Sequence, residues 1–185
     1  LAHEPDAKFV IAGTGPYENY LRNKARDMGM GDKMFFTGYL SNDDRDMLYL
    51  TASVAVFPSL YEPFGIVALE AMAAGTPVVV SDSGGLAEIV KHEEDGLHAI
   101  TGSASSLADQ ILRVLKNDFL AKKLRDNALQ KIKTMYDWRV IARKTAEVYD
   151  AVVRENSARW RDAGRISWIP SRSKKYDYRG KGVIS

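Results

Sequence analysis

The sequence predicts an α/β fold in which helices cover both faces of a doubly wound parallel sheet. Short, nearly continuous apolar runs recur through the first hundred residues, as is typical of strands buried on both faces of a parallel sheet. Segments with helical spacing lie between these runs, and such strand–helix alternation favours parallel pairing. After residue 104 only helical spacing continues. This change predicts that helices are added at the C-terminal end of the sheet.

The expected strands span residues 8–12, 34–37, 54–57, 77–81 and 96–100. The expected helices between them span residues 17–28, 43–51, 65–74 and 86–90. The first follows a Gly-Pro start, and Ser41-Asn42 supplies a cap for the second. Three further helices are expected, over residues 105–116, 119–135 and 139 to about 156. The last carries one apolar stripe, formed by Ile141, Thr145, Val148, Tyr149 and Val152.

Composition describes an ordinary globular domain. The chain has 185 residues, 45% of them hydrophobic, with 26 basic and 24 acidic side chains. No stretch reaches the roughly 18 apolar residues of a membrane-spanning helix, so no span is expected. The absence of cysteine excludes disulfides and thiolate metal sites, and three scattered histidines indicate no metal cluster. No secretory signal opens the chain, so a cytoplasmic location is expected. Because the chain begins with Leu1, we interpret it as part of a longer protein.

Positive charge gathers at the C-terminal end. Residues 154–185 hold nine basic and three acidic groups, together with Gly164, Pro170, Gly180 and Gly182. We expect a folded domain over residues 1–156 and a basic tail over 157–185 that is mobile or docks on another domain. A nucleic-acid role would depend on this tail alone, and no nucleic-acid partner is expected.

Ligands of open parallel sheets bind outside the carboxyl ends of the strands, which directs attention to the loops that follow them. The first loop, Gly13-Thr14-Gly15-Pro16, allows a close approach of backbone to ligand but lacks the third glycine of a dinucleotide fingerprint. A tight turn and a phosphate contact explain it equally well. A later loop, Ser81-Asp82-Ser83-Gly84-Gly85, could place the carboxylate of Asp82 on a ligand hydroxyl or use it as a helix cap.

The loop from Pro58 to Gly65 carries the strongest chemical signal. It leads into a helix whose free N–H groups suit an anionic phosphate. Glu62 stands just before this helix and Glu70 lies in its second turn. Since neither carboxylate balances a phosphate, each suits hydrogen bonds from sugar or ribose hydroxyls. The alternative is that Glu62 interacts with the helix dipole and Glu70 is solvated.

These residues together resemble a known family. The Glu-x7-Glu spacing of Glu62 and Glu70 is similar to that of retaining GT-B glycosyltransferases of family four and of the neighbouring starch and glycogen synthases. The resemblance covers roughly residues 5–150. It continues in Gly13-Thr14-Gly15-Pro16, Phe36-Thr37-Gly38-Tyr39, Ala71-Met72-Ala73-Ala74-Gly75-Thr76-Pro77-Val78, Gly84-Gly85-Leu86-Ala87-Glu88 and Glu94-Asp95-Gly96-Leu97.

The resemblance implies the Rossmann-like, donor-binding C-terminal half of a GT-B enzyme, with the first strand–helix unit missing. Residues 1–156 would be the nucleotide-sugar-binding domain, and the tail would dock on an N-terminal domain absent from this chain. Glu62 would be the catalytic residue that contacts the donor sugar near its reacting carbon. The donor-binding residues implied are Gly13, Gly15, Tyr39, Phe64, Gly65, Ile66, Glu70 and Thr76. In this set Glu70 holds the ribose, Tyr39 packs the base, and Thr76 lies near the diphosphate.

The same resemblance implies transfer of a hexosyl, in particular glucosyl, unit from ADP-glucose or UDP-glucose to a glycan, as in glycogen biosynthesis. No metal and no resident cofactor is implied. The cations that neutralise the diphosphate would lie upstream of Leu1, so this chain alone is expected to be inactive. Glu62 could act as a covalent nucleophile, but we favour front-face substitution, because a carboxylate bound to sugar hydroxyls is poorly placed for attack. A non-catalytic nucleotide-binding module and a nucleotide-sugar 2-epimerase of the same architecture are the alternatives.

Overall fold

The computed structural model describes the backbone of residues 4–162 and the side chains of residues 4–156. The chain divides into two compact units, residues 1–137 and residues 138–185. The second unit contributes the helix α7 (Trp138–Asp162), which continues past the boundary expected after residue 156. The remainder of the expected basic tail, from residue 163 onward, lies outside the described residues.

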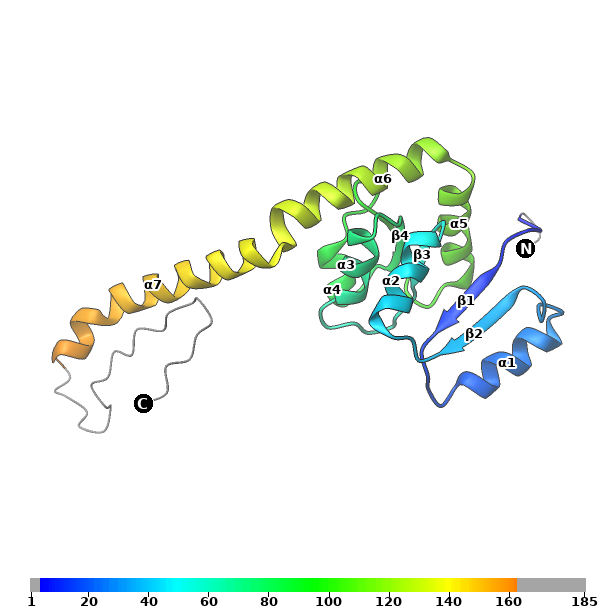
Figure 1. Cartoon of the computed structure of the whole chain (residues 1–185), viewed down its shortest axis with the longest axis horizontal. Coiled ribbons are helices and arrows are strands. Elements are labelled where there is room, and N and C mark those ends of the chain that lie inside the picture. The colour runs from blue at the N-terminus through cyan, green and yellow to red at the C-terminus, as the bar shows by residue number, and fades with distance from the viewer. Residues whose placement is uncertain (1–3, 163–185) are drawn as a thin grey trace. The chain divides into compact units, whose positions relative to one another are not determined.

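The first unit has the predicted order of elements (Figure 1). Its strands are β1 (Phe9–Ala12), β2 (Met34–Gly38), β3 (Ala55–Phe57), β4 (Val78–Ser81) and β5 (Leu97–Ala99). Its helices are α1 (Glu18–Asp27), α2 (Asn42–Thr51), α3 (Ile66–Ala73), α4 (Gly84–Ile89), α5 (Ala104–Leu115) and α6 (Asp118–Lys131). Each strand and helix expected in this unit is present, with shifted ends, and one helix changes character before its expected end.

One helix differs from the expectation. The helix predicted over residues 119–135 changes after Lys131 into a π-helical segment, Ile132–Tyr136. The hydroxyl of Thr134 donates to the carbonyl of Gln130 at 2.9 Å, so a side chain shares an acceptor that the regular helix uses. Such local side-chain bonding offers the backbone an alternative to the α-helical pattern.

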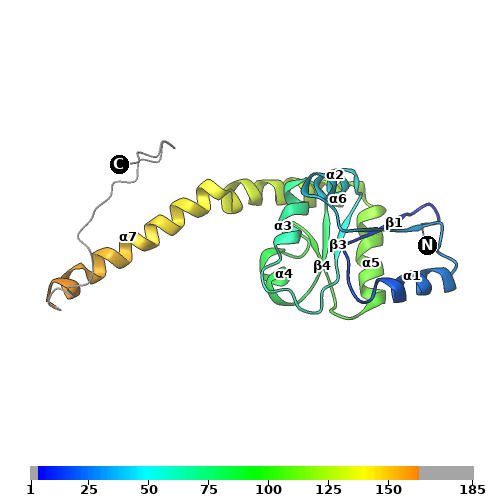
Figure 2. The same cartoon turned by 60° about the horizontal axis from the view of Figure 1, so that its bottom comes forward.

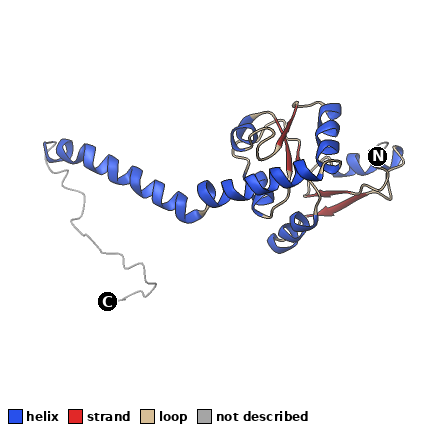
Figure 3. Cartoon of the chain, turned by 90° about the horizontal axis from the view of Figure 1, so that it is seen from above, coloured by secondary structure: helices blue, strands red, loops and turns tan. Residues whose placement is uncertain are grey.

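All strand pairs are parallel, but the strands form two sheets (Figure 3). One sheet pairs β1 with β2, and the other has the order β3-β4-β5. A six-stranded doubly wound sheet has the order 3-2-1-4-5-6. In that order β2 and β1 correspond to strands 3 and 2, and β3, β4 and β5 correspond to strands 4, 5 and 6. The strand that would join the two sheets in that order is not among the described residues.

Helices cover both faces of the three-stranded sheet, with α3 and α4 on one face and α5 on the other (Figure 1, Figure 2). Val78 and Val80 of β4 pack with Ala68, Met72 and other residues of the α3–α4 side. Val79 faces the opposite way, into a cluster with Leu97 and Val114. All three valines are fully buried. This explains why three successive positions of β4 are apolar rather than alternating with polar ones.

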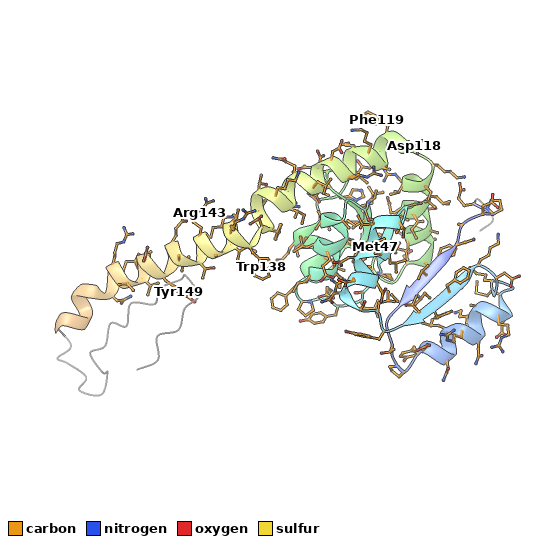
Figure 4. All side chains as sticks on the ribbon, viewed as in Figure 1. Met47, Asp118, Phe119, Trp138, Arg143 and Tyr149 are labelled. Atoms are coloured by element: carbon orange, nitrogen blue, oxygen red, sulfur yellow. The ribbon has the colours of Figure 1, made fainter. Side chains whose placement is uncertain are left out.

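The second unit is described only as α7. Its side chains include Arg143 and Tyr149 (Figure 4), and Arg143 lies 3.9 Å from the carboxylate of Glu147. Val148, Tyr149 and Val152, part of the predicted apolar stripe, are exposed. Among residues 4–162, no helix combines the length and the apolar character needed to cross a membrane.

The stability of the fold is expected to depend on pH through two neighbouring histidines, His92 and His98, the second of which belongs to β5. The backbone N–H of His98 donates to Nδ1 of His92 at 2.8 Å, and the two rings lie 5.5 Å apart. Burial lowers the pKa of His92, the nearby Glu93 raises it, and His98 and Arg113 lower it further. The pKa of His92 is lower in the folded state than in the unfolded state, so folding favours the neutral ring. The stability that neutral His92 contributes is therefore present above pH about 6.5 and is lost as pH falls through the folded-state pKa.

We therefore expect the urea midpoint of unfolding to fall between pH 7.5 and pH 5, and to fall less in His92→Asn. The side-chain oxygen of asparagine can accept the N–H of His98 but does not titrate. Equal pH dependence in the two proteins would contradict this assignment.

Candidate active site

The packing of helices α2 and α3 shows at which edge of the fold the candidate residues lie. Arg45 near the start of α2 lies 3.3 Å from Glu70 of α3. Near the other ends of the two helices, the hydroxyl of Thr76 donates to the carbonyl of Tyr49 at 2.5 Å. The helices α2 and α3 are therefore side by side and parallel. Since they follow β2 and β3, the carboxyl ends of these strands lie at one edge.

The glycine loop after β1 lines a hollow of about 220 Å³, bounded by residues 11–18 with Leu21 and Phe36. Gly13 adopts φ 113°, a value that favours glycine, and its N–H donates to the carbonyl of Gly38 at 2.8 Å. A Cβ at Gly15 would meet nothing within 4 Å. The loop therefore leaves room for a ligand beside its backbone.

The bond between Gly13 and Gly38 also brings Tyr39 next to this loop. Tyr39 is 81% exposed, so its ring is available for stacking. Gly13, Gly15 and Tyr39 therefore lie on neighbouring loops, although Tyr39 is not among the residues that line the hollow, and their shared role in binding stays a prediction.

The Glu62 loop is held against the start of α3. Oε1 of Glu62 accepts hydrogen bonds from the backbone N–H groups of Gly65, at 3.2 Å, and Phe64, at 3.4 Å. This is the helix-dipole contact that the alternative interpretation expected. Gly65 is the N-cap of α3 in a left-handed conformation, with φ 68°. The side chains of Phe64 and Ile66 are exposed, so this entrance to the helix is open to solvent.

Glu70 is not simply solvated. Its side chain is 30% exposed and its Oε1 lies 3.3 Å from Nη1 of Arg45. Burial raises the pKa of the neighbouring Tyr49, and Glu70 raises it further while Arg45 lowers it. The pKa of Arg45 is raised, first by its hydrogen bond to Asp46 and also by Glu70. Sequence analysis missed Arg45, because no spacing rule links it to a glutamate on another helix.

Two other residues have roles different from those considered. Thr76 precedes β4, at the amino end of the strand; it is 3% exposed and its hydroxyl is bonded to Tyr49. The structure does not bring Thr76 together with the other candidates. Asp82 accepts hydrogen bonds from the hydroxyl and backbone N–H of Thr101, at 2.6 and 2.8 Å, which lower the pKa of its carboxyl. It joins the loops after β4 and β5 and does not cap α4.

A single methyl group added at Gly85 is expected to lower the stability of the fold. Its N–H donates to the carbonyl of Glu62 at 2.7 Å, and a Cβ there would lie 2.6 Å from the carbonyl oxygen of Pro63. Since that neighbour is backbone, Gly85→Ala must displace the Glu62 loop. We expect the free energy of unfolding, measured in urea, to fall by about 1–3 kcal/mol.

Gly31→Ala is the matched control, because its Cβ would meet nothing within 4 Å. It should change stability by less than about 0.5 kcal/mol. Similar losses in both variants would mean that the contact at Gly85 is not specific.

No group of three or more potential metal-ligating side chains occurs in the described part of the chain. The chemistry at this edge comes from two carboxylates, a helix N-terminus, two glycine loops and an exposed tyrosine. The fold and these residues are those of a Rossmann-like domain whose ligand site lies at the carboxyl ends of the strands.

Comparison with known proteins gives the family. The profile "Glycosyl transferases group 1" matches residues 1–131, and the chain belongs to this family. It is 45% identical over 144 residues to an uncharacterized glycosyltransferase of Methanocaldococcus jannaschii, covering 78% of this chain and 37% of that protein. It is 37% identical over 150 residues to a glycogen synthase of Mycobacterium tuberculosis, covering 81% of this chain and 36% of that protein.

Solved structures agree with this. Sucrose-phosphate synthase from Thermosynechococcus elongatus aligns with a TM-score of 0.74 and 32% identity, over 83% of this chain and 40% of that one. HepE of Anabaena in complex with UDP-glucose aligns with a TM-score of 0.73 and 25% identity, over 80% of this chain and 42% of that one. The chain therefore spans well under half the length of these relatives, and it has the GT-B glycosyltransferase fold of their matching part.

Proposed function

We propose that this chain is the donor-binding part of a retaining glycosyltransferase that moves a hexosyl unit from a nucleotide sugar to a glycan acceptor. The observation that carries the proposal is the placement of two carboxylates along one helix: Glu62 lies at the open N-terminal end of α3, and Glu70 lies in its second turn. Glu62 can accept hydrogen bonds from the sugar hydroxyls, and Glu70 can accept them from the ribose hydroxyls. The free N–H groups at the start of the helix can donate to the diphosphate.

The proposed roles follow the chain. Gly13 and Gly15 line the pocket, Tyr39 packs the base, and the backbone of Phe64, Gly65 and Ile66 approaches the sugar and the diphosphate. Thr76 has no role here, since its hydroxyl is bonded inside the fold. No metal and no resident cofactor takes part in this proposal.

For the donor we propose ADP-glucose or UDP-glucose, and for the acceptor an α-glucan, as in glycogen synthesis. The similarity to a glycogen synthase and the UDP-glucose complex of HepE support this choice. The partner is an N-terminal GT-B domain that these residues do not include. Without that domain and the upstream cations, we propose that the chain alone has no transferase activity. A cytoplasmic location stays a prediction.

The test is calorimetric titration of the intact protein that carries these residues with ADP, UDP, GDP and their glucose conjugates. We expect one nucleotide to bind, and Glu70→Ala to weaken it about 10- to 100-fold, because a hydrogen bond to a charged group is lost. Glu94→Ala is the control: Glu94 also forms an ion pair, with Lys91 at 2.5 Å, but lies outside the site. No binding of any nucleotide at millimolar concentration would refute the proposal.

A further inference from the structure

We infer that Arg45 is a positioning residue for the nucleotide: it orients the carboxylate of Glu70 and so sets a preference for ribonucleotides over 2′-deoxyribonucleotides. The inference rests on the proposed function, in which Glu70 accepts hydrogen bonds from ribose hydroxyls. Arg45 need not touch the nucleotide to act in this way.

The guanidinium of Arg45 is itself held by its own helix. Nε and Nη2 lie 3.2 and 3.0 Å from Oδ1 of Asp46, and Nη1 lies 3.4 Å from Oδ1 of Asn42. The same Nη1 lies 3.3 Å from Oε1 of Glu70. Because three contacts of the guanidinium come from α2, its positive charge is held beside Glu70 and does not move as a free surface charge would.

The helix that carries Arg45 is fixed at both ends. At its start, the hydroxyl of Ser41 accepts the N–H of Asp44 at 3.2 Å. Toward its end, Tyr49 packs edge-to-face on Phe57, with ring centroids 6.3 Å apart, and its carbonyl accepts the hydroxyl of Thr76. The position of Arg45 relative to α3 is therefore set by the fold.

A fixed partner matters because of how a glutamate binds a ribose. Two neighbouring hydroxyls can both donate to one carboxylate only when its plane has the right orientation. A free glutamate side chain would lose rotamer freedom on binding, and Arg45 causes much of that loss before the ligand arrives. The carboxylate keeps lone pairs for two further hydrogen bonds, since Arg45 approaches it as an ion pair 3.3 Å from Oε1.

Arg45 and Glu70 also lie between the regions proposed to bind the two other parts of the nucleotide. Arg45 follows the loop that carries Tyr39, proposed to pack the base, and Glu70 belongs to the helix whose N-terminus is proposed to bind the diphosphate. The ribose joins these two parts of a nucleotide. A residue between them can act on the sugar without contact to either end.

The experiment compares dissociation constants of ADP with 2′-deoxy-ADP, and of UDP with 2′-deoxy-UDP, by calorimetry on the intact protein. The variants are Arg45→Met, Arg45→Lys and Glu70→Ala. Arg113→Met is the control, because Arg113 forms a comparable, exposed ion pair with Glu93 outside the site. Thermal melting of each variant establishes that it is folded.

We expect the natural protein to prefer the ribonucleotide about tenfold, since a charge-assisted hydrogen bond is lost with the 2′-hydroxyl. Arg45→Met should reduce this preference to about threefold or less, with little change in the affinity for the deoxynucleotide. Arg45→Lys keeps the positive charge but lacks the planar guanidinium, so its ribonucleotide preference should lie between those of the natural protein and Arg45→Met. If Arg45→Met does not fold, the preference of Arg45→Lys is the test of the inference. Arg113→Met should behave as the natural protein.

Three results would overturn the inference. If Glu70→Ala abolishes the preference and Arg45→Met retains it, Arg45 does not position Glu70, and the proposed function stands. If Arg45→Met weakens ribo- and deoxynucleotides equally, Arg45 contacts the nucleotide itself. If neither Glu70→Ala nor Arg45→Met changes the preference, Glu70 does not bind the ribose, and its role in the proposed function fails as well.

Discussion

Lys131→Met is expected to lower the free energy of unfolding by about 3–5 kcal/mol, because it leaves a buried carboxylate without its cation. Nζ of Lys131 lies 2.6 Å from Oδ2 of Asp95, and it also donates to the carbonyl of Ile89. Asp95 is 3% exposed, and its other oxygen accepts the N–H of Lys91 at 2.8 Å. In the variant, methionine fills the space of the lysine stem but cannot replace its charge.

The loss should appear as a lower urea midpoint with an unchanged slope. The double variant Asp95→Asn/Lys131→Met should recover part of it, since the amide retains an acceptor for Lys91 without a buried charge. Lys122→Met is the exposed control: its lysine forms an ion pair with Asp126 at 2.5 Å, and about 0–1 kcal/mol is expected. A similar loss in Lys122→Met and Lys131→Met would show that burial of Asp95 does not determine the effect.

The sequence predicts the elements of this fold because their periodicities reflect burial. Val78-Val79-Val80 is apolar at each position, and the structure buries all three side chains against opposite faces. Strand pairing is a different matter, because it depends on contacts between distant segments. The alternation of strands and helices predicts parallel strands, but it does not show that β1 and β3 belong to separate sheets.

The candidate site is predictable to the extent that it consists of loops after strands. Glu62, Gly65 and Glu70 lie where the strand–loop–helix pattern places them. Thr76 could have been separated from this set by the same rule, because it precedes a strand and so lies at the amino end. Arg45 could not have been found in this way, since its contact with Glu70 depends on how α2 packs beside α3.

With Glu62 beside the reacting carbon, as proposed above, Glu62→Gln in the intact protein is expected to lower kcat about 10²-fold or more while changing KM little, because charge stabilisation at that carbon would be lost. The change is nearly isosteric. The amide oxygen of glutamine can still accept the N–H groups of Gly65 and Phe64, so the loop should keep its position. Transfer of the sugar from the nucleotide sugar that binds, followed at several donor concentrations, separates kcat from KM. Unchanged kcat would remove Glu62 from the reaction.

The same variant distinguishes the two mechanisms of retention. Oε1 of Glu62 accepts two backbone N–H groups at the start of α3, which ties the carboxylate to its own loop and leaves only Oε2 for attack on the anomeric carbon. A carboxylate held in this way cannot turn freely toward the sugar, so we expect front-face substitution, residual turnover in Glu62→Gln and retained anomeric configuration. Mass spectrometry of the natural protein with donor should detect no glycosyl adduct. An adduct on Glu62, together with complete loss of turnover in Glu62→Gln, would instead establish the covalent route.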